Sequence, residues 1–78
     1  MKEIYVLSVQ YEYEGSDVIG AFIGLNSALK GMRDYISSNS FHDGFVINKV
    51  YPNQVYDEVV EFKTYDPNGL LLKDTMAL

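Results

Sequence analysis

The sequence contains no cysteine, and this absence excludes two ways of stabilising a small fold. Without thiols the chain can form neither a disulfide nor a thiolate metal site. A chain of 78 residues makes one domain, 1–78, with a modest core. Its stability must therefore come from packing within that domain or from self-association.

Long apolar runs are also lacking. The longest nearly apolar run, 18–25, has eight residues, whereas a membrane-spanning helix needs about twenty. The first residues lead directly into a strand-like alternation rather than into a signal peptide. We therefore expect no membrane association and a cytoplasmic location, in a bacterium or in the host of a phage.

Positive charge is scarce, with six Lys and Arg against eleven Asp and Glu, so the net charge is −5. An acidic surface repels phosphates, which predicts no direct nucleic-acid binding and favours a protein partner with a basic surface. Tryptophan is absent, but seven tyrosines are present. Tyrosine can pack its ring while its hydroxyl stays in water.

The stretch 26–38 is the only convincing helix in the sequence. Its apolar residues recur at helical spacing on one face: Leu25, Ala28, Leu29, Met32 and Ile36. Asn26 or Ser27 is expected to cap the first turn. This helix is predicted to cover one face of a sheet.

Strands are predicted over 3–14, 18–24, 45–51 and 55–65, with a possible short fifth strand over 70–72. Gly15-Ser16 is the expected hairpin turn, and Asp66-Pro67-Asn68-Gly69 fits a type I turn. The β-β-α-β-β order predicts an α+β fold, a small antiparallel sheet with one helix packed on one face. Residues 74–78 are expected to form a loose or interface tail.

Four segments carry a resemblance to known proteins: Ile4-Tyr5-Val6-Leu7, Tyr11-Glu12-Tyr13-Glu14, Ile19-Gly20 and Asp43-Gly44-Phe45-Val46-Ile47. They resemble a family of short uncharacterised bacterial and phage proteins. Those proteins begin with a similar Tyr-Val-Leu strand, pass through an acidic hairpin and start the third strand with aspartate, glycine and an aromatic residue. The resemblance covers roughly residues 3–62. It implies the β-β-α-β-β order and a bacterial or phage origin, and it implies no activity.

Glu12, Glu14 and Asp17 gather at the tip of the predicted hairpin. Carboxylates this close could hold a divalent cation, but their spacing does not match an EF-hand loop. A solvated turn is the simpler interpretation, and we expect no metal and no cofactor.

A second acidic group, Asp57, Glu58 and Glu61 with Asp66, falls on the predicted fourth strand. Asp57 and Glu61 would share one face of that strand. Carboxylates in a row at intervals of about 7 Å imitate the spacing of nucleic-acid phosphates, so this edge could occupy a basic groove. Alternatively, charge on an edge strand prevents aggregation.

No catalytic motif is present, and His42, the only histidine, is expected in a surface loop. The predicted partner-binding surface combines acidic and tyrosine side chains: Tyr11, Glu12, Tyr13, Glu14, Asp17, Tyr56, Asp57, Glu58 and Glu61. The apolar C-terminal end offers a possible dimer contact: Leu70, Leu71, Leu72, Met76 and Leu78.

Three functions remain open. The first is a small non-enzymatic protein-binding module, in its sharpest form a phage-type, anti-CRISPR-like inhibitor of a host defence or nucleic-acid-handling protein. The second is a self-associating structural or accessory domain that forms a homodimer. The third is a small-ligand-binding domain with a pocket between the helix and the sheet.

Overall fold

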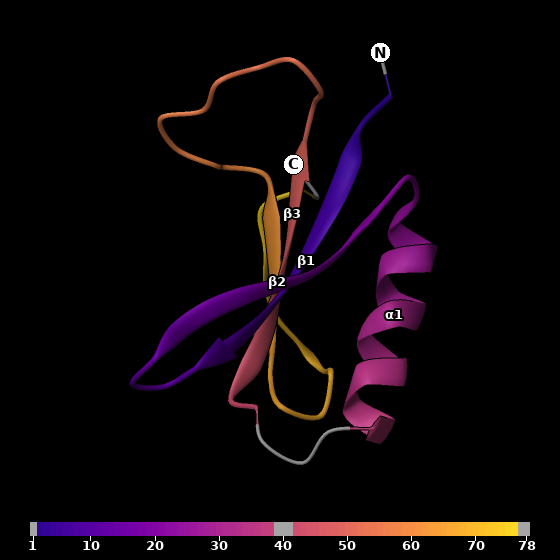
Figure 1. Cartoon of the computed structure of the whole chain (residues 1–78), viewed down its shortest axis with the longest axis vertical. Helices are drawn as coiled ribbons and strands as arrows, with labels where there is room; N and C mark the ends of the chain where they lie inside the picture. The colour runs from indigo at the N-terminus through magenta and orange to yellow at the C-terminus, as the bar shows by residue number, and fades with distance from the viewer. Residues whose placement is uncertain (1, 39–41, 77–78) are drawn as a thin grey trace.

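The computed structural model describes residues 2–38 and 42–76 of the chain. One helix follows the first two strands, and three strands follow the helix (Figure 1). The elements are β1 (Ile4–Tyr11), β2 (Gly15–Phe22), α1 (Leu25–Ser38), β3 (Gly44–Val50), β4 (Phe62–Tyr65) and β5 (Leu71–Asp74). They form one antiparallel sheet in the order β2-β1-β3-β4-β5. The predicted α+β class, the helix and the fifth strand are therefore confirmed.

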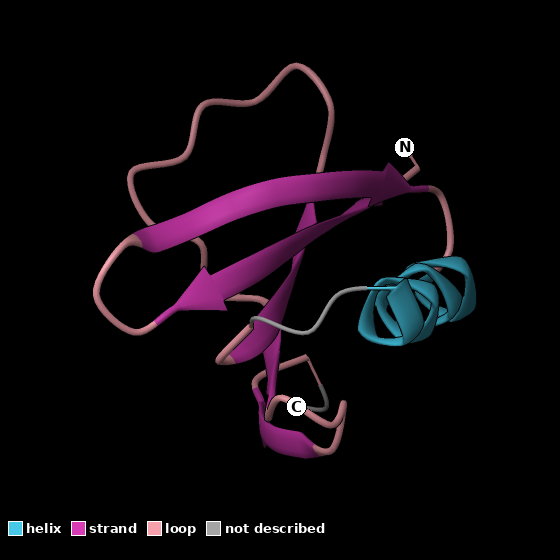
Figure 2. Cartoon of the chain, turned by 60° about the horizontal axis from the view of Figure 1, so that its bottom comes forward, coloured by secondary structure: helices cyan, strands magenta, loops and turns pink. Residues whose placement is uncertain are grey.

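The helix connects two strands that are not neighbours in the sheet. Both β2 and β3 run antiparallel to β1, so they are parallel to each other with β1 between them. A connection between parallel strands needs a crossover, and α1 supplies it. Figure 2 shows the helix on one side of a strongly twisted sheet. Among the described helices and strands, nothing packs on the opposite face.

The core lies between α1 and the sheet face that it covers. Leu7 and Val9 of β1 are paired with Ile47 and Phe45 of β3, and all four are almost completely buried. From the helix, Ala28 and Met32 are buried, while Leu25, Leu29 and Ile36 pack partly buried against this cluster. The predicted apolar helix face is confirmed. Each fully buried aliphatic side chain of this kind contributes about 1.5–3 kcal/mol.

The helix begins one residue earlier than predicted. The backbone N–H of Ala28 donates to the carbonyl oxygen of Gly24 at 3.1 Å, which places Gly24 at the N-cap position. Asn26 and Ser27 therefore lie inside the first turn, and the prediction that one of them is the cap was wrong. Glycine is tolerated at this position because the cap residue has a non-helical backbone.

The ring of Phe22 lies against bare backbone from two elements. A Cβ atom placed on Gly20 of β2, or on Gly31 of α1, would lie 2.7 Å from an atom of this ring. Such a distance is far inside van der Waals contact, so the two glycines provide the space that the ring fills. They set how closely the helix approaches the edge of the sheet.

The β1–β2 turn lies earlier than the predicted Gly15-Ser16. Tyr11 pairs with Gly15, so the connection consists of residues 12–14, and β2 starts at Gly15 with a φ of 83°. A hairpin loop of three residues followed by a glycine of positive φ is a common solution. The acidic residues Glu12 and Glu14 thus form the turn itself rather than the end of a strand.

The predicted fourth strand, 55–65, is mostly a loop. Only Phe62–Tyr65 pairs with β3, and the last contact of this pairing is the N–H of Lys49 donating to the carbonyl of Glu61 at 2.8 Å. Residues 51–61 leave the sheet. Proline has no backbone N–H to donate to a neighbouring strand, and Asn53 has a φ of 63°. Pro52-Asn53 therefore turns the chain out of the sheet, although Val59 and Val60 later in this segment favour strand pairing.

The chain returns to the sheet after the predicted turn at 66–69. Gly69 N–H donates to the carbonyl of Asp66 at 2.9 Å, and Gly69 has a φ of 85°, as the turn prediction requires. Asp74 belongs to β5, the N–H of Thr75 donates to the carbonyl of Phe62 at 2.9 Å, and Met76 packs against the core. Residues 74–76 are thus attached to the sheet and do not form a loose tail. Leu78 lies outside the described residues.

Candidate functional site

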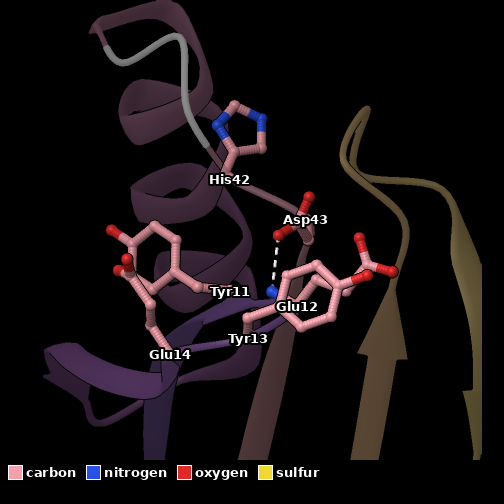
Figure 3. Close-up of a pocket in the computed structure, with 6 residues that line it drawn as sticks. All are labelled: Tyr11, Glu12, Tyr13, Glu14, His42 and Asp43. Carbon is pink, nitrogen blue, oxygen red and sulfur yellow. Dashed lines mark hydrogen bonds between the residues drawn. The ribbon is translucent and has the colours of Figure 1, made fainter.

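A hollow of about 430 Å³ opens at the hairpin end of the sheet, where the β1–β2 turn faces the start of β3 (Figure 3). We call it the hairpin cleft. Its lining residues are Tyr11, Glu12, Tyr13, Glu14, His42 and Asp43. A second hollow, of about 590 Å³, adjoins it and shares Tyr11, Glu12 and Asp43. Neither hollow is lined by a residue of α1, so neither is the pocket between helix and sheet that the small-ligand alternative would require.

Two hydrogen bonds fix the walls of the hairpin cleft. The N–H of Glu12 donates to the carboxylate of Asp43 at 2.6 Å, and the N–H of Asp43 donates to the carbonyl of Gln10 at 2.9 Å. Figure 3 shows the first of these as the link between the turn and the residues that precede β3. A carboxylate that accepts a backbone N–H makes a strong hydrogen bond, so the turn is held in one position.

Tyr11 joins the hairpin cleft to the helix. Its hydroxyl lies 3.2 Å from the hydroxyl of Tyr35 in α1. The hydrogen bond with Tyr35, partial burial and the carboxylates of Asp17 and Glu14 raise the pKa of Tyr11 to about 12. The phenol is therefore neutral at physiological pH and is available as a donor or an acceptor, while the negative charge around it stays uncompensated.

His42 lies in the loop before β3, and its ring is partly buried against the core. Its ring packs against the rings of Phe45, at 5.1 Å between centroids, and Tyr35, at 6.2 Å. Its Nε2 donates to the carbonyl oxygen of Pro67 at 2.7 Å, which joins the start of β3 to the β4–β5 turn. The Nδ1 atom is buried without a hydrogen-bond partner. The predicted loop position is confirmed, but the ring is partly buried and packs at the rear of the cleft.

Within the described residues, no ion pair involves the carboxylates at this end. The described chain has the ion pairs Lys30–Asp34, Lys49–Glu61 and Lys63–Asp74, and none of them lies at the hairpin cleft. Within residues 2–38 and 42–76, no three His, Asp or Glu side chains converge as metal ligands would. The hairpin cleft is thus an acidic site whose carboxylates are not neutralised by an ion pair within the described chain. The Tyr13 residue that lines it is 91% exposed.

The second predicted acidic group does not form a row. Asp57 and Glu58 lie exposed in the loop 51–61. Glu61 approaches Lys49 at 3.9 Å, and the carboxylate of Asp66 accepts the N–H groups of Asn68 and Leu70. Because the segment is not a strand, the regular spacing that would imitate phosphates is absent. This corrects the prediction of an acidic strand edge.

Tyr56 lies on the same loop and is 37% exposed. Its hydroxyl accepts the N–H of Tyr51 at 2.6 Å, so the ring ties the loop to the end of β3. It lies outside the lining of the hairpin cleft, and the structure therefore does not bring together all the residues of the predicted partner surface. The hairpin residues and the loop residues are two separate regions.

The C-terminal leucines remain uncovered. Leu70, Leu71 and Leu72 are 65%, 52% and 68% exposed. Met76 instead packs against the protein's own core. Among the described residues of the predicted dimer contact, three leucines at the β4–β5 turn and along β5 are exposed.

Sequence reasoning missed the contribution of His42 and Asp43 to the cleft. The β1–β3 register, in which Gln10 pairs with Gly44, brings this segment beside the hairpin turn. That register depends on a pairing between strands separated by the whole helix, and the sequence carries no local signal for it. The sequence pattern at Asp43-Gly44 predicted a turn before the third strand, but it gave no indication of a role for Asp43 at the hairpin.

Comparisons of the chain with protein-family models, with curated proteins and with solved structures find no match. In residues 2–38 and 42–76, no helix combines the length and the apolar character that crossing a membrane requires.

Proposed function

We propose that this chain is a small non-enzymatic protein-binding module, and that the hairpin cleft receives a basic segment of its partner. The observation that carries the proposal is the group of carboxylates at the cleft, Glu12, Glu14 and Asp43, which form no ion pair within the described chain. The exposed ring of Tyr13 lies beside them. Tyrosine buries a large area at low entropic cost, and the carboxylates supply attraction to Lys or Arg.

The arrangement favours a side chain over a free ion. A guanidinium or an ammonium can lie over a tyrosine face while it bonds to carboxylates, and these interactions contribute more as water is excluded. The walls of the cleft are fixed by the Glu12–Asp43 and Tyr11–Tyr35 hydrogen bonds. A preformed site loses little conformational entropy on binding, which raises affinity.

The sharpest form of this proposal is a phage-type inhibitor of a host defence or nucleic-acid-handling protein. It is supported by the small acidic chain and by the resemblance of residues 3–62 to bacterial and phage proteins. The acidic strand edge no longer supports it, so in this form the carboxylates of the hairpin end would enter the basic groove. Competition between this protein and an oligonucleotide for a captured nucleic-acid-binding partner tests it.

The test of the general proposal uses a fluorescein-labelled arginine-rich peptide and an otherwise identical glutamate-rich peptide. Fluorescence anisotropy gives affinities, and amide chemical shifts of Glu12, Glu14 and Asp43 report the place of binding. We expect binding of the basic peptide alone, with affinity that falls as salt increases.

The decisive variant is the double substitution Glu12→Lys and Glu14→Lys, and its matched control is Asp57→Lys with Glu58→Lys. Both change the net charge by the same amount on exposed residues. We expect the hairpin variant to weaken binding at least about tenfold, and the loop variant to change it less than about threefold, because only the first changes the cleft. Equal losses would show general charge attraction and would contradict the proposal.

A further inference from the structure

The sheet face turned away from α1 is almost free of charge. Residues paired in register share a face, and those on this outer face are Ile4, Val6, Ser8, Gln10, Ser16, Val18, Ala21, Gly44, Val46, Asn48, Val50, Phe62, Thr64 and Lys73. Lys73 is the only charged residue of this set, in a chain of which 22% of residues are charged. In an antiparallel sheet with one face in water, the side chains on that face are normally polar or charged. Half of the residues in this set are apolar and only one is charged, which is unusual for a face in full contact with water.

The described helix and strands leave this face uncovered. The helix packs on the other side of the sheet, mainly against β1 and β2, and Tyr35 also contacts Phe45 of β3. Val18 is 67% exposed, and Val6, Val46 and Phe62 are partly exposed. The ammonium of Lys73 lies 5.5 Å from the centroid of the Phe62 ring. Apolar side chains thus cross the sheet from β2 to β4, and no described helix or strand forms a second layer over them.

Both free edges of the sheet are poorly suited to pairing with another copy. The β1–β2 register shifts between Leu7 and Ser8, which leaves Ile19 as an extra residue in β2. The β4–β5 register shifts between Thr64 and Tyr65, which leaves Leu72 as an extra residue in β5. Bulges on edge strands bend the edge and prevent the regular hydrogen bonding that edge-to-edge association needs.

We propose that two copies of this chain pack their outer faces together and form a dimer of four layers, α-β-β-α. The area reaches the lower limit for a specific interface. Strands of eight, eight, seven, four and four residues, at a rise of about 3.3 Å and a spacing of about 4.8 Å, cover about 500 Å². Two such faces cover about 1,000 Å², the minimum for a specific interface, so we expect a weak dimer that forms at high protein concentration.

Charge also favours a second copy of the chain as the occupant. Two chains of net charge −5 repel each other, and the repulsion is smallest when they meet through a surface without carboxylates. Ser8, Ala21 and Thr64 are small, so two sheets can approach to the usual separation of about 10 Å. Lys73 lies on β5, an edge strand, where its ammonium can reach water at the rim of the interface. The dimer does not depend on the proposed role of the hairpin cleft.

Sedimentation equilibrium of the whole chain, from micromolar to near-millimolar concentration, tests the proposal. We expect a mass of twice 8.9 kDa at the upper concentrations. The variant Asn48→Glu puts a carboxylate on the outer face between Val6 and Phe62. It should weaken association at least about a hundredfold, because a charge would be buried without a partner. The matched control Asn26→Glu makes the same change on the exposed first turn of the helix and should alter association less than about twofold.

Two results would overturn the proposal: a wild-type mass of 8.9 kDa at every concentration, or a folded Asn48→Glu variant that associates like the wild type. Near-ultraviolet circular dichroism shows whether the variant is folded. If it is not, isotope-filtered NOEs between labelled and unlabelled wild-type chains decide the question. Contacts between the methyl groups of Val6 and Val46 across the two chains support the outer face, and contacts confined to Leu70, Leu71 and Leu72 refute it.

Discussion

The hydroxyl groups of Tyr11 and Tyr35 lie 3.2 Å apart and join the hairpin end of the sheet to the last turns of the helix. Replacing Tyr35 by Phe removes this hydrogen bond and keeps the ring in its edge contact with Phe45. Since the Tyr35 hydrogen bond is the largest cause of the raised pKa of Tyr11, that pKa should fall from about 12 towards 10. It should remain above 10 because Asp17 and Glu14 are still present. NMR titration of ¹³C-labelled tyrosine measures it.

The same substitution should lower the free energy of unfolding by about 1 kcal/mol, the usual net contribution of one hydrogen bond. Urea denaturation gives this value. Tyr13→Phe is the control, since its ring is 91% exposed, and it should change neither the pKa of Tyr11 nor the stability. A Tyr11 pKa that stays near 12 in Tyr35→Phe would show that burial and the carboxylates cause the shift without the hydrogen bond.

Gly31 lies inside α1, where alanine would normally increase helix stability by about 1 kcal/mol. Here the added Cβ would lie 2.7 Å from the ring of Phe22, which is also in contact with Gly20. The ring lies against both glycines, so Gly31→Ala should lower the free energy of unfolding by about 1–3 kcal/mol, as overpacking does. Thermal and urea denaturation measure the loss.

Two further variants separate the clash from other effects of removing glycine. Gly24→Ser adds a Cβ in open space at the N-cap and should be neutral or stabilising. Phe22→Leu in the Gly31→Ala background should recover part of the loss, because the smaller side chain vacates the contact. If Gly31→Ala is more stable than the wild type, the ring moves freely and this account of the two glycines is wrong.

Local patterns were enough to predict most of the fold. The helix has a clear 3.6-residue repeat and buries the face that the repeat defines, with Ala28 and Met32 at its centre. The turn at Asp66–Gly69 needs only one aspartate, one proline and one glycine at fixed positions. Such signals lie within a few residues of each other, and tertiary contacts did not override them.

Predictions failed where pairing between distant segments decides the outcome. Val59 and Val60 have high β propensity, yet they lie in a loop because β3 ends at Val50 and the chain turns away from the sheet at Pro52-Asn53. Asp43 lines the cleft because β3 pairs with β1, although the whole of α1 separates these strands in the sequence. β propensity depends on the neighbouring strand, and one chain's local sequence does not specify that neighbour.

Thr75 attaches the C-terminal segment to β4. Its hydroxyl accepts the N–H of Phe62 at 2.8 Å, and it also contacts the carbonyl oxygen of Val60. Thr75→Val keeps the shape and removes the hydroxyl, so the N–H of Phe62 loses that partner. We expect a loss of about 1–2 kcal/mol in unfolding free energy, and faster amide exchange at Phe62. Thr75→Ser retains the hydroxyl and should preserve the slow exchange, whereas equal exchange in all three proteins would contradict this role.

The free energy of unfolding should fall above pH 10 because of Tyr65. Burial and the nearby Asp74 raise the pKa of Tyr65 to about 12 in the folded protein, and an unfolded tyrosine titrates near 10. The folded state therefore holds this proton more tightly, so the stabilisation is complete below about pH 10 and is lost as the pH rises through about 12. Tyr11 contributes in the same direction.

Urea denaturation between pH 9 and 12 measures the slope of the free energy of unfolding against pH. Tyr65→Phe should make it shallower, Tyr13→Phe should leave it unchanged, and an unaltered slope in Tyr65→Phe would exclude Tyr65 as its cause.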